Sequence, residues 1–148
     1  MMTLVADIEQ ELKAARLGRV ADRRDTLALV LSALRSAEKD LQRPLSDDES
    51  LQVLQRERKK RVEAIEAYRA AGRVEQAEGE ESELDVIEEF MPEQLGEDAL
   101  DEIVDDVIAE VGATSLRDLG RVMADVMPRV SGRADGSVVS QIVREKLA

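Results

Sequence analysis

The sequence contains no cysteine and no histidine among its 148 residues. Without cysteine the chain has neither a disulfide framework nor a thiol nucleophile. Without histidine it lacks the usual general base near neutral pH and the commonest ligand of transition metals. A Ser-His-Asp or Cys-His catalytic site is therefore excluded, and no metal or other cofactor is expected. Carboxylates and lysines remain available for acid–base chemistry, but a non-catalytic protein without a small-molecule substrate is favoured.

Aromatic residues are almost absent, and Tyr68 and Phe90 are the only two. Stacking on single-stranded nucleic acid needs several exposed rings, so that mode of recognition is excluded. No apolar run is long enough to cross a bilayer, and the N-terminus lacks a basic segment followed by an apolar one. We expect a cytoplasmic protein that has no membrane partner.

The charge is strongly acidic, because 33 Asp and Glu residues face 21 Lys and Arg residues and give a net charge of −12. Nucleic acids and anionic membranes repel such a protein at long range. Any contact with RNA must therefore come from a local basic patch. From Arg117 onward the chain has six bases and only four acids, so its last two predicted helices are expected to be locally basic.

Apolar residues recur at helical spacing almost everywhere, and no segment alternates with the period of a strand. The pattern predicts four helices in the first 92 residues. Thr3 and Asp22 are the expected caps of the first two, and proline at position 44 ends the second. Ser46 and Glu49 form a capping box for the third helix, which stops at residue 72. The fourth is expected over residues 74–90.

Residues 91–96 break the helical pattern and set a domain boundary between residues 1–92 and 93–148. Three shorter helices follow. The first closes at Gly112, the second runs from residue 114 or 115 to Pro128, and the third begins after Asp135. We therefore predict an all-α fold, with an N-terminal domain resembling a four-helix bundle and a small C-terminal three-helix domain.

The turn before the last helix carries a candidate site. Gly132 and Gly136 bracket the turn, and the carboxylate of Asp135 can cap the helix that follows. Arg133 is then expected to contribute little to the structure of the turn. An exposed arginine beside a helix N-terminus is one way to bind phosphate, although a plain helix-entry turn gives the same pattern.

Other cations complete the set of RNA-binding candidates. One group comes from the C-terminal domain and the other from a basic run in the third helix. The candidates are Arg117, Arg121, Arg129, Arg133, Lys146, Arg56, Lys59 and Lys60. The alternative for both groups is ordinary surface charge, and in the third helix a solvated face joined by pairs such as Glu57 with Arg61.

Taken with these residues, the chain resembles the YqeY-like family, which is related to the tail of the B subunit of aspartyl/glutamyl-tRNA amidotransferase. The resemblance covers nearly the whole chain and rests on Ala71-Gly72-Arg73, Phe90-Met91-Pro92-Glu93-Gln94-Leu95, Asp118-Leu119-Gly120-Arg121-Val122-Met123 and Gly132-Arg133-Ala134-Asp135-Gly136. It implies an all-helical protein with a small C-terminal three-helix domain. Arg58 departs from the pattern, because relatives often have an apolar residue there, and this bears on the packing of the third helix.

The resemblance also implies a function. The amidotransferase is a carbon–nitrogen ligase with glutamine as amido donor, and its tail is an accessory module that helps to hold tRNA. Residues 132–136, and loosely Gly120 and Arg121, are those to which that role carries over. The expectation is a non-catalytic tRNA-binding or tRNA-complex accessory protein, whose partner is tRNA or a complex that modifies or aminoacylates it. The alternative is a protein–protein adaptor that uses an apolar groove between the two predicted domains.

Overall fold

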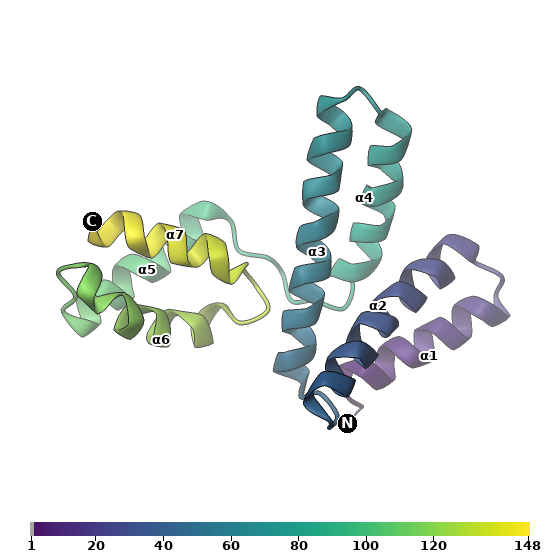
Figure 1. Cartoon of the computed structure of the whole chain (residues 1–148), viewed down its shortest axis with the longest axis horizontal. Coiled ribbons are helices and arrows are strands. Elements are labelled where there is room, and N and C mark those ends of the chain that lie inside the picture. Colours follow the sequence, from purple (N-terminus) through teal and green to yellow (C-terminus); the bar gives the residue numbers. More distant parts are fainter. Residues whose placement is uncertain (1) are drawn as a thin grey trace. The chain divides into compact units, whose positions relative to one another are not determined.

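The computed structural model describes residues 2–148, which form seven α-helices and one short 3-10 helix and contain no strand. The predicted all-α fold is confirmed. Figure 1 shows the helices in chain order. They are α1 (Leu4–Leu17), α2 (Ala21–Leu41), α3 (Asp47–Ala70), α4 (Val74–Glu88), α5 (Glu97–Val111), the 3-10 helix η1 (Leu116–Asp118), α6 (Leu119–Val130) and α7 (Gly136–Leu147).

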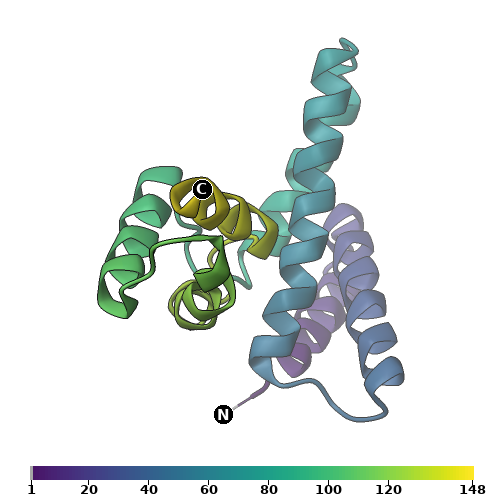
Figure 2. The ribbon, with the colours of Figure 1, turned by 60° about the vertical axis from the view of Figure 1, so that its left-hand side comes forward.

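The chain divides into two compact units, and the second begins at Glu93. In the first unit α1 packs on α2, and α3 and α4 form a helical hairpin along which the two helices stay in contact. Figure 1 shows α3 and α4 side by side, and in Figure 2 α4 lies largely behind α3. The α2 helix joins the two pairs, because it packs against α3 as well as α4.

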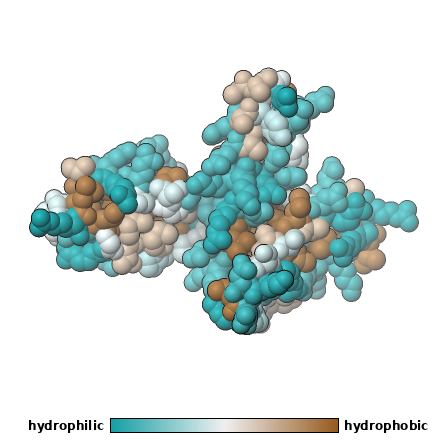
Figure 3. All heavy atoms as spheres, viewed as in Figure 1, coloured by the Kyte–Doolittle hydropathy of each residue, from teal (hydrophilic) through white to brown (hydrophobic). Residues whose placement is uncertain are grey.

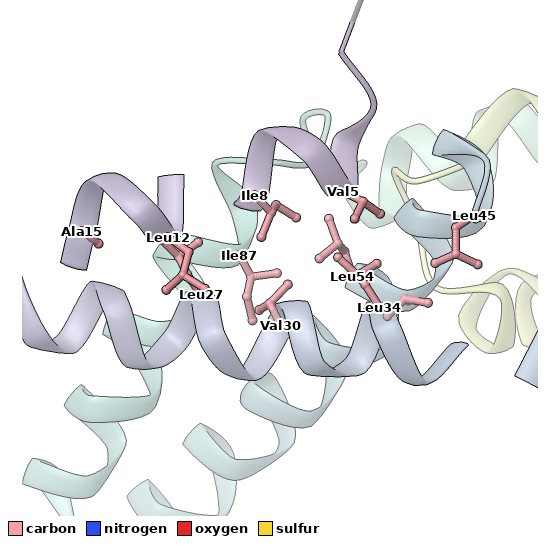
Figure 4. Packing of buried hydrophobic residues seen from close by; sticks show 11 residues of the cluster. Val5, Ile8, Leu12, Ala15, Leu27, Val30, Leu34, Leu45, Leu54 and Ile87 are labelled. Carbon is pink, nitrogen blue, oxygen red and sulfur yellow. The ribbon is translucent and has the colours of Figure 1, made fainter. Parts of the chain in front are cut away.

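One apolar core holds the first unit together. Ile8, Leu27, Leu34, Leu54 and Ile87 are fully buried and come from all four of its helices. Figure 4 shows their side chains converging between α1, α2 and the two helices of the hairpin. Burial of large aliphatic side chains contributes on the order of 2 kcal/mol each, so this cluster fixes how the four helices pack.

The helix ends in this unit confirm two predicted caps and correct a third. Thr3 is the N-cap of α1, and its Oγ1 accepts from the backbone N–H of Ala6 at 3.2 Å. Ser46 Oγ accepts from the backbone N–H of Glu49 at 3.2 Å, and Glu49 Oε1 accepts from the N–H of Ser46 at 3.0 Å, so the capping box is confirmed. The prediction that Asp22 caps α2 is wrong. The N-cap is Val20, which has no capping side chain, and Asp22 lies in the first turn, where its charge suits the helix dipole.

The basic run of α3 differs from a solvated helix face. Arg61 is buried and donates to Glu57 Oε1 at 3.2 Å, so the predicted pair exists but lies inside the protein. Its Nε also donates to Glu83 on α4 at 3.3 Å. Arg58, which occupies an apolar position of the pattern, is half-buried and donates to Glu88 at 3.0 Å. Both arginines therefore join α3 to α4.

The second unit is a three-helix arrangement around a valine-rich core. Val104, Val107, Val122, Val126 and Val139 are fully buried and come from α5, α6 and α7. The α6 helix packs against both α5 and α7, and those two also contact each other.

The end of α6 corrects a predicted boundary. The helix continues past Pro128 to Val130, rather than ending at the proline. Proline lacks a backbone N–H, but in the last turn this removes a single hydrogen bond, which packing of Val130 in the core offsets.

Candidate functional site

The turn between α6 and α7 is held in a defined conformation. Gly132 has φ of +72°, in the left-handed region that glycine adopts without strain, and it is buried. The N–H of Arg133 donates to the carbonyl of Val130 at 2.8 Å. Asp135 is the N-cap of α7, and its Oδ1 accepts from the N–H of Ser137 at 3.0 Å. Backbone and cap together fix how the turn enters α7.

The turn is also tied to the start of the second unit. The carbonyl of Arg133 accepts from the N–H of Leu95 at 2.8 Å, and the carbonyl of Gly132 accepts from Gln94 Nε2 at 2.8 Å. Arg133 Nε donates to the carbonyl of Glu93 at 3.3 Å. Arg133 is half-buried and joins the turn to residues 93 and 95, so the expectation that it contributes little to the structure was wrong. We name residues 93–95 and 131–135, joined by these bonds, the pinned turn.

Gly136 contributes differently from Gly132. It is the first residue of α7, and a Cβ added there would lie 3.5 Å from Cε of Met127, which is an ordinary contact. Glycine is therefore required by backbone conformation at position 132, and by neither conformation nor space at position 136.

Three predicted cations of the second unit form ion pairs with carboxylates, and two of these carboxylates lie on α5. The pairs are Arg121 with Asp118 at 3.1 Å, Arg129 with Glu110, and Lys146 with Asp105 at 2.9 Å. The hydrogen bond with Glu110 raises the pKa of Arg129, and that with Asp105 raises the pKa of Lys146. The surface expected to be locally basic is partly neutralised, because helix packing brings the acids of α5 to the cations that follow them in sequence.

Arg117, Arg133 and Arg144 are different, because none of them forms an ion pair with a carboxylate within residues 2–148. Arg117 lies on η1 and Arg144 on α7, which pack against each other, and both side chains are exposed. Arg144 Nε donates to Ser140 Oγ at 3.3 Å, a neutral acceptor that leaves its charge in place. Sequence reasoning left Arg144 out of the candidates. Arg144 follows Ser140 by four residues, on the side of α7 opposite its apolar residues. This spacing indicates an exposed side chain and could have added Arg144 to the candidates.

The cations of the second unit form two groups rather than one patch. The turn connects the end of α6 to the start of α7, so Arg129 and Arg133 lie near that end of the pair. Arg117 and Arg144 lie near the other end, where η1 contacts α7. Arg144 lies eight positions after the first residue of α7, which is about 12 Å along a helix.

The candidates on α3 belong to the first unit. Arg56, Lys59 and Lys60 are all exposed, and Lys60 Nζ donates to Glu57 Oε2 at 2.8 Å. Arg56 forms no ion pair within the described part of the chain. Whether Arg56 binds an anion stays a prediction of the sequence pattern, and the structure places the side chain on the surface.

The described residues contain no group of three or more acidic, histidine or cysteine side chains that could hold a metal ion. No helix among them has the length and the apolar character that a membrane span requires.

Hydrophilic side chains cover most of the face of each unit that is visible in Figure 3, and smaller apolar patches lie among these side chains. Val138 on α7 and Leu116 on η1 are the exposed large apolar residues of the second unit, at 44% and 50%.

These features define an all-α protein whose second unit carries a pinned turn between its last two helices. The chain belongs to the YqeY-like family, because the model of that family, described as Yqey-like protein, matches residues 5–147. The block at residues 90–95 that carries the resemblance thus includes the three residues that hold the turn.

Two relatives are similar over most of their own length. An uncharacterized protein of Schizosaccharomyces pombe is 37% identical over 90 residues, which cover 61% of this chain and 73% of that protein. A protein of Pyrenophora tritici-repentis named altered inheritance of mitochondria protein 41, mitochondrial, is 28% identical over 146 residues, covering 96% of this chain and 77% of the relative. The second name places that relative in mitochondria.

Proposed function

We propose that this protein is a non-catalytic accessory factor that binds tRNA, or a tRNA-containing complex, through its second unit. The proposal is carried by the arginines of the second unit that no carboxylate of the described residues neutralises, and it is supported by the pinned turn. Its sequence is the one that resembles the amidotransferase tail, and its backbone is fixed on both sides by hydrogen bonds. A preorganised turn meets a folded RNA without losing conformational entropy on binding.

The recognition chemistry is contact with phosphates and with the shape of a folded RNA. Arg117 and Arg144 supply two uncompensated charges on neighbouring elements. The N-terminus of α7 is a weaker phosphate site, because the carboxylate of Asp135 already caps it. With a net charge of −12 the chain alone gains little from long-range attraction, so a partner enzyme that also holds the RNA is expected to strengthen binding.

A binding titration with a charge-matched control tests the proposal. The full chain is titrated into labelled bulk tRNA at low and at physiological salt, beside the double variant Arg117→Glu/Arg144→Glu. The control is Lys13→Glu/Arg16→Glu, which changes the same charge on two exposed positions of α1. We expect salt-sensitive binding, and a slope against log salt that falls by about two in the first variant only.

Two outcomes would contradict the proposal. Absence of binding at low salt means that the fold is kept without the RNA contact. Equal weakening of both double variants means that the second unit holds no specific surface and that binding follows net charge alone. Circular dichroism of each variant establishes that the helices are intact.

The alternative role, a protein–protein adaptor, was predicted to use a groove between the two domains, whereas the groove that supports it here lies within the second unit. A groove of about 340 Å³ between α5 and α7 is lined by four apolar residues and three polar ones, namely Leu95, Leu100, Val138 and Ile142 with Glu97, Gln141 and Glu145. An amphipathic helix of a protein partner is the occupant that such a groove suits. A partner that binds with little salt dependence, in a chain that does not bind tRNA, would support this role.

A further inference from the structure

A cleft of about 560 Å³ opens in the first unit between the start of α2 and the α3–α4 hairpin. Its volume lies in the range typical of small-molecule sites. Val20 and Val86 and the ring of Tyr68 supply apolar and aromatic lining. None of the RNA-binding candidates lines it, so the cleft is separate from the surface described above.

Carboxylates stand on both walls of this cleft. Asp22 and Asp25 lie three residues apart on α2, and Glu80 and Glu83 lie three residues apart on α4. Side chains at this spacing share one helix face, about 5–6 Å apart. Each wall therefore presents a pair of acids, with apolar surface between the walls.

The cations nearby leave two of these acids uncompensated. Arg23 is the one cation of the lining, and its guanidinium donates to Glu89 at 2.7 Å and Glu11 at 3.2 Å, neither of which lines the cleft. Arg24 pairs with Asp25, and Arg61 pairs with Glu83. No ion pair reaches Asp22 or Glu80 within residues 2–148.

The environment of Glu80 disfavours its negative charge. The pKa of Glu80 is raised, first by burial and then by the charge of Glu83, with which it shares a hydrogen bond; Arg61 only partly opposes this. A cation placed in the cleft would favour the ionised carboxylate.

We propose that this cleft binds a linear aliphatic polyamine. Ammonium groups spaced along one chain can meet the acids of both walls, while the methylene segments cover Val20 and Val86 and an ammonium lies against the ring of Tyr68. A single divalent ion is a poorer fit, because the described residues offer no group of three carboxylates to coordinate it.

Tyr68 makes the test direct. It is the only tyrosine, and the chain has no tryptophan, so fluorescence excited at the tyrosine band reports on the lining of this cleft. The full chain is titrated with spermidine at pH 7 and physiological salt, and with magnesium chloride at matched ionic strength. We expect a saturable one-to-one signal with spermidine and none with magnesium.

Paired variants separate a built site from diffuse attraction to an acidic protein. Asp22→Asn/Glu80→Gln removes the two uncompensated acids, and Glu63→Gln/Glu66→Gln removes two exposed acids of α3 away from the cleft. Calorimetry is expected to show spermidine affinity reduced by about ten-fold or more in the first variant and within about two-fold of the parent in the second. A non-saturating signal, an equal response to magnesium, or equal loss in both variants would overturn the proposal.

Discussion

Glu49 performs two roles at the start of α3, and the second of them requires its negative charge. Oε1 closes the capping box, and the two carboxylate oxygens each accept from the guanidinium of Arg43 at 2.7 Å. Arg43 is the larger cause, followed by the backbone bond from Ser46, and together they lower the pKa of Glu49 to about 2. Bidentate pairing of this kind is stronger than a single neutral hydrogen bond.

This shift predicts how the fold responds to acid. A carboxyl whose pKa is lowered in the folded state stabilises the fold fully above its unfolded value, 4.5, and loses that contribution as pH falls toward about 2. Glu49→Gln should therefore be less stable than the parent at pH 7, and the two should converge near pH 2. Urea unfolding across this range measures the difference, and carbon-detected NMR gives the carboxyl titration. An ordinary midpoint near 4.5 for Glu49 would refute the argument.

At the scale of elements, the α3–α4 hairpin is joined by charge as well as by apolar contact. Arg58 pairs with Glu88, Arg61 with Glu83, and Arg69 with Glu81, so ion pairs recur along the two helices. Arg61 is the most buried, with a side chain 9% exposed beside a Glu57 side chain that is 10% exposed. Buried charges depend on their partners, so this position should be the least tolerant of the three.

Removal of Arg61 tests that ranking. Arg61→Leu leaves the carboxylates of Glu57 and Glu83 without their shared cation, and we expect a loss of about 3 kcal/mol in the free energy of unfolding. The matched Arg58→Leu should cost at most about 1 kcal/mol, because its side chain is 26% exposed and water screens the pair. Urea denaturation of both variants gives the comparison. Equal costs would mean that burial does not set the strength of these pairs.

The helices were predictable from sequence, whereas their ionic contacts were not. Periodicity places the helices, and the Ser46 box is complete within four residues, so local pattern is sufficient for both. The pairing of Arg61 with Glu83 depends on α4 folding back against α3, which no local pattern contains. The same limit applies to Arg129, whose partner Glu110 reaches it only through the packing of α5 on α6.

The pinned turn also combines features that the local sequence predicts with contacts that only the folded structure brings about. Gly132 and Asp135 could be placed from residue type, because a positive φ and an N-cap each have a strong local preference. The half-burial of Arg133 could not, because it follows from hydrogen bonds to residues about forty positions earlier. The shape of the turn follows from its own residues, whereas the hydrogen bonds that hold it come from residues 93–95.

At the scale of the whole molecule, each unit has a core of its own. The buried cluster of the first unit draws on α1 to α4, and that of the second draws on α5 to α7, with no residue in common. The second unit has only about 55 residues, for which a total stability of roughly 3–8 kcal/mol is typical. A single large cavity in its core therefore removes much of what holds it.

Two cavity-forming substitutions distinguish the units. Leu100→Ala and Ile87→Ala each remove a buried aliphatic side chain, from the second and first core respectively, and each should cost about 3 kcal/mol. Hydrogen exchange of the full chain measures where protection is lost. We expect Leu100→Ala to expose amides of α5 to α7 while those of α1 to α3 stay protected, and Ile87→Ala to do the reverse. Equal loss of protection in both units from either substitution would mean that the chain unfolds as one cooperative whole, and that the pinned turn draws its rigidity from more than the core of its own unit.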